Sequence, residues 1–264
     1  MLSIHSLFNR KNKSQDDIRY IEIDETDSTN NYIKSILATL DGVQKEPRMC
    51  VAYADYQTAG RGQGTNHWES EQGKNLLFSI LCHPVWVPIQ SQFLVSEAEA
   101  IALHDALSAY TDDITIKWPN DIYWKDKKIS GTIIENNLHA GHIKDCIIGT
   151  GVNVNQTEFK SDAPNPVSLC QIIGKETDRM ALLKDIVKRF DAYLTDLRNG
   201  NYEKIVSLYM SYLYRSHGFF PFKDKDGEFE AAIVEVEDDG HLILRDKGDV
   251  IRSYAFKEVE FIIK

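Results

Sequence analysis

Cysteine is scarce in this sequence: four occur in 264 residues, far apart and without a C-x-x-C pair. Three of them lie in apolar, strand-like segments, where cysteine packs as a small hydrophobic residue. The spacing of histidines is also unlike that of a metal site, because His139 and His142 lie close together on an expected turn. The sequence therefore argues against structural disulfides and against a zinc site.

Long hydrophobic runs are absent as well. The longest apolar stretches, such as residues 76–81, have the length of a strand and are far too short to cross a bilayer. The N-terminal residues lack the continuous apolar core and the cleavage site of a signal peptide. With 42% hydrophobic and 27% charged residues, the composition is that of an ordinary globular protein. We expect a soluble, cytoplasmic protein without membrane association.

Positive charge is in short supply over the whole chain. The formal net charge is −10, and the pI is near 5.3. A protein whose main task is to hold nucleic acid is usually basic, because the phosphate backbone supplies most of the binding energy. We therefore expect no nucleic-acid partner, although this balance is compatible with a local basic site.

Two nucleotide-binding signatures are missing. A Walker A loop needs Ser or Thr after its Gly-Lys pair, and neither Gly73 with Lys74 nor Gly174 with Lys175 meets that condition. The glycines of residues 60–64 lack the dinucleotide-binding spacing, and an expected strand follows them where that fold needs a helix. These absences exclude a P-loop NTPase and argue against a dinucleotide-binding domain.

Hydrophobic periodicity divides the chain into three parts. Residues 1–18 are polar and of mixed charge, as in a flexible leader. Residues 19–216 alternate between strand and helix patterns, and they include an amphipathic helix at 178–198 that ends before Gly200. Residues 217–264 read as short strands separated by turns, which predicts a small all-β domain that begins near His217.

The order of the expected elements favours a mixed α and β fold. In the larger part, strands are expected at 20–24, 49–55, 75–82, 114–118, 122–124, 128–136 and 143–154, with a helix after the first strand and another at 92–110. The last four strands are joined by connections too short for crossover helices, so we expect them to be antiparallel neighbours. In the smaller part, strands are expected at 229–236, 241–244, 250–255 and 259–263.

Three segments carry chemistry that suits an anionic ligand. They are the glycine-rich run that contains Arg61, the two strands that carry Lys117 and Lys128, and the glycine-rich strand 149–153. Glycines let backbone N–H groups approach phosphate oxygens closely, and the three cations would offset a nucleotide's charge. Taken singly, the glycines also suit ordinary turns and the lysines also suit solvated faces, so the residues alone leave both readings open.

Five segments resemble the sequence motifs of the biotin–protein ligase family, both in their residues and in their order. They are Asp-Ser-Thr-Asn at 27–30, Tyr-Gln-Thr-Ala-Gly-Arg-Gly at 56–62 with Trp68, Lys-Trp-Pro-Asn-Asp at 117–121, Lys-Ile-Ser-Gly at 128–131 with Glu135, and Gly-Thr-Gly-Val-Asn-Val-Asn at 149–155. The Lys-Trp-Pro-Asn-Asp run together with the Gly-Arg-Gly loop is highly specific. The resemblance covers roughly residues 20–155.

The resemblance implies an α+β fold. In that family a mixed, largely antiparallel sheet flanked by helices, related to class II aminoacyl-tRNA synthetases, precedes a small SH3-like β-barrel. The implied catalytic domain is residues 19–216 and the implied barrel is residues 217–264. Some members also carry an N-terminal DNA-binding domain, but the first motif here begins at Asp27, so we expect the monofunctional kind.

The resemblance also implies the activity. A biotin–acetyl-CoA-carboxylase ligase forms biotinyl-AMP from biotin and ATP, with Mg²⁺ as cofactor and pyrophosphate as product, and then transfers biotin to a lysine of a biotin carboxyl carrier protein. The oligomeric state stays open.

Site residues follow from the matched motifs. Ser28 and Gln57 would meet the ureido end of biotin, which needs both donors and acceptors when it is buried; the alternative for Ser28 and Thr29 is capping of the following helix. The implied biotin-binding set is Ser28, Thr29, Asn30, Gln57, Gly60, Arg61, Gly62, Gln63, Lys128 and Gly131. The implied ATP-binding set is Arg61, Trp68, Lys117, Asn120, Lys128 and Asn153.

Lys128 is the implied central catalytic residue, with Arg61, Lys117 and Asp121 as the other catalytic residues. Biotin's carboxylate must meet the α-phosphate of ATP, and a lysine that bridges both offsets their repulsion. Asp121 would assist Mg²⁺ or the acceptor lysine, or would only stabilise a turn. Trp68 would anchor the loop or belong to the core, and we favour the core.

One departure from the family pattern lies in the glycine loop. Many members have further arginines after Gly-Arg-Gly, whereas this chain has Gln63 and Asn66, so Arg61 is the loop's only formal cation. Two other functions were weighed: a lipoate-type ligase, which the loop and the Lys-Trp-Pro-Asn-Asp run oppose, and a non-catalytic, biotin-responsive regulator, which the acidic pI opposes.

Overall fold

The computed structural model describes residues 18–40, 48–62, 64, 67–161 and 163–263. The expected leader therefore lies outside the described residues, apart from Ile18, which already belongs to the first strand. No helix in the described part of the chain combines the length and the apolar character that crossing a bilayer requires.

A seven-stranded sheet forms the centre of the molecule, in the order β1-β2-β3-β7-β6-β5-β4. Only β1 and β2 pair in parallel, and every other neighbouring pair in this sheet is antiparallel. The predicted mixed, largely antiparallel sheet is thus confirmed. Its strands are β1 (Ile18–Thr26), β2 (Met49–Gln57), β3 (Leu76–Cys82), β4 (Ile114–Lys117), β5 (Asp121–Trp124), β6 (Lys127–His139) and β7 (His142–Val152).

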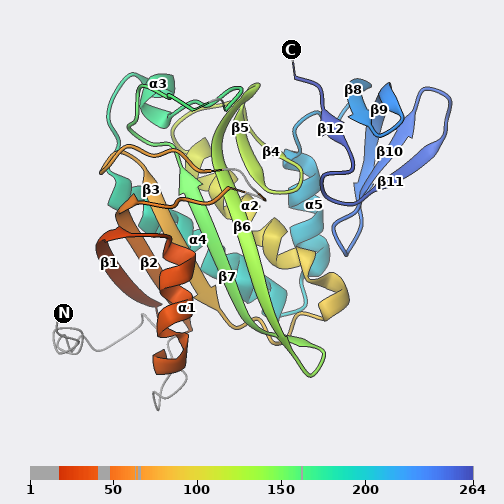
Figure 1. The fold of residues 1–264 in the computed structure, drawn as a ribbon. Helices are drawn as coiled ribbons and strands as arrows, with labels where there is room; N and C mark the ends of the chain where they lie inside the picture. The colour runs from red at the N-terminus through yellow and green to blue at the C-terminus, as the bar shows by residue number, and fades with distance from the viewer. Residues whose placement is uncertain (1–17, 41–47, 63, 65–66, 162, 264) are drawn as a thin grey trace.

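Helices cover both faces of this sheet, and alternation along β2 shows why (Figure 1). Met49 and Val51 point into a large core with α2 (Phe93–Ser108) and α4 (Arg179–Arg198). Cys50 and Ala52 point to the opposite face and pack with Ile33 of α1 (Thr29–Leu40). A strand buried on both faces needs apolar residues at every position, which explains the continuous apolar run in β2 and β3.

The helix predicted at 178–198 is confirmed as α4, and its ends show why it forms there. Asp178 caps it by accepting the backbone N–H groups of Met180 (2.9 Å) and Ala181 (3.0 Å). At the other end Gly200 adopts a positive φ of 80°, which glycine does without steric cost. The short elements η2 (Ile89–Ser91), α3 (Leu169–Ile173) and α5 (Tyr202–Tyr212) were not predicted.

The C-terminal residues form a second, five-stranded antiparallel sheet in the order β11-β10-β9-β8-β12. Its strands are β8 (Phe220–Asp224), β9 (Gly227–Val236), β10 (Leu242–Asp246), β11 (Ile251–Tyr254) and β12 (Glu260–Phe261). Within the described residues no hydrogen-bonded pairing joins β11 to β12, so the small β-unit that was predicted is present as a sheet with two edges. Phe222 and Leu242 share the core of α2 and α4, and Trp118 Nε1 donates to the Gly240 carbonyl at 3.0 Å.

Candidate active site

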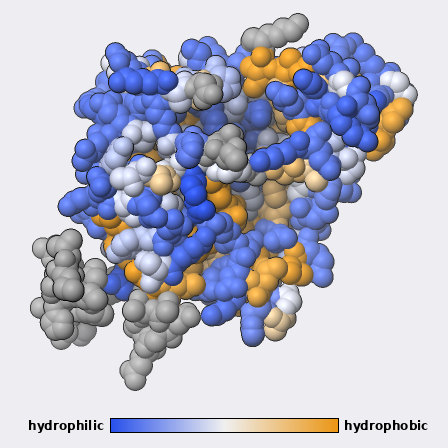
Figure 2. Space-filling model, in the orientation of Figure 1, coloured by the Kyte–Doolittle hydropathy of each residue, from blue (hydrophilic) through white to orange (hydrophobic). Residues whose placement is uncertain are grey.

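A cavity of about 1040 Å³ opens where the central sheet meets the C-terminal strands. Figure 2 shows this face, on which apolar surface gathers at the centre of largely hydrophilic surroundings. Most of the predicted site residues line the cavity, namely Ser28, Thr29, Asn30, Gln57, Arg61, Gly62, Trp68, Lys117, Asn120, Asp121, Lys128 and Gly131. The fold thus gathers four of the five motifs, together with Gly149 and Gly151 of the fifth, around one cavity.

Glycines of β6 and β7 form the floor of this cavity. Gly131 and Gly151 lie opposite each other in the two strands. A β-carbon on Gly131 would lie 2.9 Å from Lys128 Cε and 3.2 Å from the Trp68 ring, and one on Gly151 would overlap the Trp68 indole. Only glycine at both positions leaves room for the Trp68 indole that lies over the two strands. Trp68 itself is half-buried, and it lines the cavity as well as packing on its floor.

The start of α1 supplies a buried polar cluster at one end of the cavity. Ser28, Thr29 and Asn30 are each at most 4% exposed. Gln57 Oε1 accepts the backbone N–H of Thr29 (2.8 Å) and its hydroxyl (3.0 Å). The hydroxyl of Ser79, on β3, donates toward Asn30 Oδ1 at 2.5 Å. Donors and acceptors are therefore already oriented around this end before a ligand arrives.

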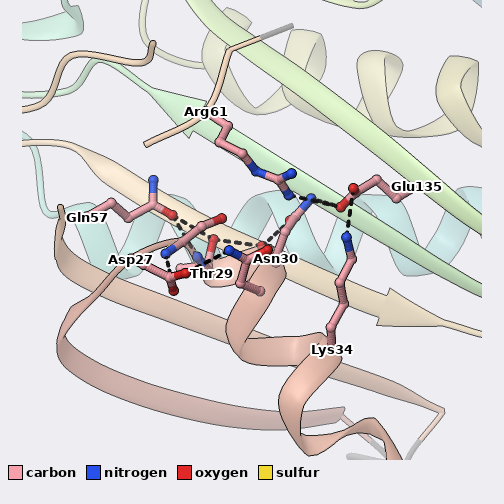
Figure 3. A network of polar contacts seen from close by, with 10 residues as sticks. Asp27, Thr29, Asn30, Lys34, Gln57, Arg61 and Glu135 are labelled. Atoms are coloured by element: carbon pink, nitrogen blue, oxygen red, sulfur yellow. Dashed lines mark hydrogen bonds and ion pairs between the residues drawn. The ribbon is translucent and has the colours of Figure 1, made fainter. Parts of the chain in front are cut away.

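Glu135 ties that cluster to the glycine loop, as Figure 3 shows. Its carboxylate accepts from Asn30 Nδ2 (2.8 Å) and Lys34 Nζ (2.8 Å), and it pairs with the Arg61 guanidinium at 3.3 Å. Burial opposes ionisation of Glu135, but the hydrogen bonds from Lys34 and Asn30 outweigh it and hold the pKa of Glu135 below its ordinary value. Arg61 is thus engaged by a protein carboxylate. Sequence reasoning placed Glu135 in a motif but gave it no role.

Three charged side chains meet at the ends of β4, β5 and β6. Lys128 Nζ pairs with Asp121 Oδ1 at 2.8 Å, and Lys117 lies directly across from Asp121 in the β4–β5 pair. Lys117 is half-buried, with its ammonium 4.8 Å from the centre of the Phe261 ring. Burial lowers the pKa of Lys117, the nearby Asp121 raises it, and Lys128 adds repulsion. The structure thereby brings together three of the four predicted catalytic residues.

The remaining predicted residues take different positions. Asn120 Nδ2 donates to the Ser96 hydroxyl at 3.3 Å. Gly60 is buried beneath the loop, where its carbonyl accepts the Trp68 N–H at 3.0 Å, and it does not line the cavity. Asn153 also lies outside the lining, and its Oδ1 is buried without a partner in the described structure. Gln63 and Asn66 lie outside the described residues.

A buried acid beneath the floor was missed by sequence reasoning. Glu99 of α2 is fully buried, and its Oε1 accepts from Thr150 (2.8 Å) and Thr132 (3.2 Å), which both line the cavity. Burial raises the pKa of Glu99 to about 7, against the two hydrogen bonds. The signal that could have found it is an acid inside a helix whose other residues are mostly apolar.

Comparison with known proteins places these features in a family. The sequence model of the Biotin/lipoate A/B protein ligase family matches residues 23–153. The bifunctional ligase/repressor BirA of Bacillus subtilis is 28% identical over 216 residues, which are 79% of this chain and 65% of that protein. The biotin–acetyl-CoA-carboxylase ligase of Mycobacterium tuberculosis is 27% identical over 184 residues, or 67% of this chain and 64% of that one. The chain thus spans somewhat less than two thirds of the length of these relatives.

Solved structures share the fold. The biotin protein ligase of Aquifex aeolicus, in complex with biotin and ATP, matches with a TM-score of 0.75 and 24% identity over 93% of this chain and 99% of that chain. The enzyme of Leishmania major, in complex with biotinyl-5-AMP, matches with a TM-score of 0.58 and 21% identity over 90% and 98%. The family match and the motifs agree that residues 23–153 form a domain of the Biotin/lipoate A/B protein ligase family, and the solved structures agree with the fold.

Proposed function

We propose that this protein is an ATP-dependent biotin–protein ligase. It would form biotinyl-AMP from biotin and ATP and then transfer biotin to a lysine of a biotin carboxyl carrier protein. The observation that carries the proposal is one cavity that combines a neutral, preorganised polar end at Ser28–Asn30 with a cationic end at Lys117 and Lys128. A neutral cyclic urea suits the first end, and a nucleotide suits the second.

The polar end has the groups that a buried ureido ring needs. Gln57 Oε1 is occupied by Thr29, which leaves the Gln57 amide N–H groups to donate to a ligand. The hydroxyl of Ser28 both donates and accepts, and the Asn30 side chain is fixed by Ser79 and Glu135. Gly131, with Lys128 and the Trp68 ring against it, would contact the ligand at the floor, while Arg61 and Gly62 would offer the loop backbone.

The cationic end suits the first chemical step. A carboxylate oxygen of biotin attacks the α-phosphorus of ATP, the bond to the pyrophosphate oxygen breaks, and pyrophosphate leaves. Lys128 would bridge the two anions as they approach, which stabilises the charge of the transition state. Asp121 holds the Lys128 ammonium at 2.8 Å and so positions it. Lys117, buried beside them, would hold phosphate oxygens.

Mg²⁺ would arrive with the nucleotide. Within the described residues, the only cluster of three potential metal ligands is Glu237, Asp239 and His241, and it does not include a residue of the central cavity. Mg²⁺ in nucleotide sites is usually held by phosphates, water and one or two carboxylates, and Asp121 is suitably placed for that role.

At the nucleotide end, Asn153 and Trp68 have unfilled hydrogen-bonding capacity. Asn153 Oδ1 and Trp68 Nε1 are both buried without a partner among the described residues. Buried polar atoms of this kind are uncommon unless a ligand or water completes them. Trp68 and Asn120 line the cavity, whereas Asn153 Oδ1 lies behind the lining and would accept from the adenine amino group if the bound nucleotide opens access to it.

In the second step the acceptor lysine's amine would attack the biotinyl carbonyl, and AMP would leave. We further propose that the acceptor is a carrier domain of a biotin-dependent carboxylase and that the enzyme acts in the cytoplasm. The boundary of the catalytic domain is proposed near His217, between α5 and β8. Lipoate remains the rival substrate, because the matching family includes lipoate ligases.

Biotin-dependent exchange of pyrophosphate into ATP tests the first step, and labelling of a purified carrier domain tests the second. Calorimetry with biotin and with lipoate separates the two substrates. Lys128→Ala should abolish most of the exchange, whereas Lys127→Ala is the matched control, because Lys127 is exposed next to it. An unmodified protein that shows no exchange with either acid would contradict the proposed function.

A further inference from the structure

The glycine loop between β2 and β3 is unusually poor in positive charge for a loop that faces a nucleotide. Arg61 is its only lysine or arginine between Gly60 and Trp68. That guanidinium also pairs with Glu135, which holds it at the polar end of the cavity. The described structure therefore leaves the loop without a free cation of its own.

A cation from the C-terminal sheet lies against this loop instead. Lys257 belongs to the turn between β11 and β12, and it lines the same cavity as Lys117 and Lys128. Its Nζ is so close to Gly64 that a β-carbon on that glycine would lie 2.7 Å from it. Two segments that are far apart in the sequence thus meet at this point.

The backbone at Lys257 is conformationally unusual. Glu258 N–H donates to the Ala255 carbonyl at 3.1 Å and closes a turn whose third residue is Lys257, with φ of +72°. Glycine or asparagine normally occupies such a position, because a β-carbon is strained there. Strained backbone of this kind tends to occur at functional sites, and Lys257 is also the residue whose ammonium lies against Gly64.

The Lys257 ammonium also has no counter-ion in the described part of the chain. Lys128 pairs with Asp121 and Arg61 pairs with Glu135, but none of the ion pairs there includes Lys257. The neighbouring carboxylate of Glu258 instead accepts the Ala255 N–H at 2.9 Å. Lys257 therefore keeps its full charge available to an anion in the cavity.

We propose that Lys257 binds the phosphates of the nucleotide, and so supplies from the C-terminal sheet the positive charge that the glycine loop lacks. The ligand class is a nucleoside triphosphate, followed by the phosphate of the acyl adenylate. This inference rests on the proposed function. It makes the C-terminal sheet part of the nucleotide site, while the polar end at Ser28–Asn30 is built from other elements and does not depend on it.

The test compares Lys257→Gln, Lys257→Gly and Lys257→Arg with the matched control Lys225→Gln, an exposed lysine in the β8–β9 turn. Calorimetry measures the Kd of biotin alone and then the Kd of a non-hydrolysable ATP analogue with biotin bound. We expect Lys257→Gln and Lys257→Gly to weaken the ATP analogue about tenfold or more, which is the scale of one charge-assisted contact. Biotin affinity should stay within twofold, and Lys257→Arg and the control should resemble the unmodified protein.

Lys257→Gly guards against a folding artefact, because glycine suits a positive φ and should keep or raise the unfolding temperature. Unchanged affinity for the ATP analogue in both uncharged variants would overturn the inference and leave the proposed function intact. Equal weakening in the arginine variant would overturn it too, because charge would then not be the cause. If the unmodified protein binds neither biotin nor the ATP analogue, the proposed function fails first.

Discussion

Gly149 of β7 has almost no room for a side chain, and replacing it with alanine probes the floor of the cavity. It lies between Ser79 of β3 and Ile133 of β6, and a β-carbon there would overlap the side-chain amide of Asn30. Asn30 has little freedom to move, because Ser79 donates to its Oδ1 (2.5 Å) and its Nδ2 donates to Glu135 (2.8 Å).

The expected cost follows from this overpacking. Forcing one methyl group into a filled core typically costs about 1–3 kcal/mol. At roughly 2–4 °C per kcal/mol for a chain of this size, Gly149→Ala should lower the unfolding temperature by about 2–12 °C. It should also weaken biotin binding about tenfold or more, since a displaced Asn30 costs the order of one hydrogen bond or two. Differential scanning calorimetry and a biotin titration measure the two effects.

A double-mutant cycle with Asn30→Ala tests the cause. Asn30→Ala alone should be destabilising, because it leaves the Ser79 hydroxyl and Glu135 with one partner fewer. It also removes the obstructing amide, so Gly149→Ala should cost at least about 1 kcal/mol less in that background than in the unmodified protein. Equal costs in both backgrounds would show that Asn30 does not limit the space at Gly149, and the reasoning would be refuted.

Three further predictions concern individual charges. Lys128→Ala should lower adenylate formation about a hundredfold or more while biotin binding stays largely intact, because its charge matters most in the transition state; pyrophosphate exchange within tenfold of the unmodified protein would contradict this. Arg61→Gly should speed dissociation of preformed biotinyl-adenylate severalfold, because the loop loses the ion pair with Glu135 that fixes it over the cavity, and an unchanged off-rate would show that this ion pair does not retain the adenylate. Burial, with repulsion from Asp238, raises the pKa of Glu97 to about 8 from an ordinary 4.5. Between these two values the folded state keeps a proton that the unfolded state has lost, so the stability of the folded state falls as the pH rises through this range. Glu97→Gln should flatten that fall in the unfolding temperature, and an unchanged pH profile would contradict the assignment.

Local pattern was sufficient for much of the fold. The apolar stripe and Gly200 predicted α4 to within a residue, because burial periodicity and a glycine stop are properties of neighbouring residues. The strands other than β8 were predicted from alternating or continuous apolar patterns, which are also local. α5 was missed because only Ile205 and Tyr209 are buried along it, which is too sparse a stripe to stand out. β8 was missed because Pro221 and its exposed positions interrupt the alternation.

The motifs likewise identified most of the predicted site residues that line the cavity, because a matched sequence motif specifies the position of a residue as well as its type. Only the tertiary structure decided which charges meet. That Arg61 pairs with Glu135, that Glu99 lies beneath the floor, and that Lys257 reaches Gly64 all depend on the packing of distant segments. The sequence by itself determined the family resemblance and most of the elements, since both follow from local residue patterns. The electrostatics of the site came from long-range packing, because the interaction of two charges depends on their separation in space and on their burial, neither of which a linear sequence states.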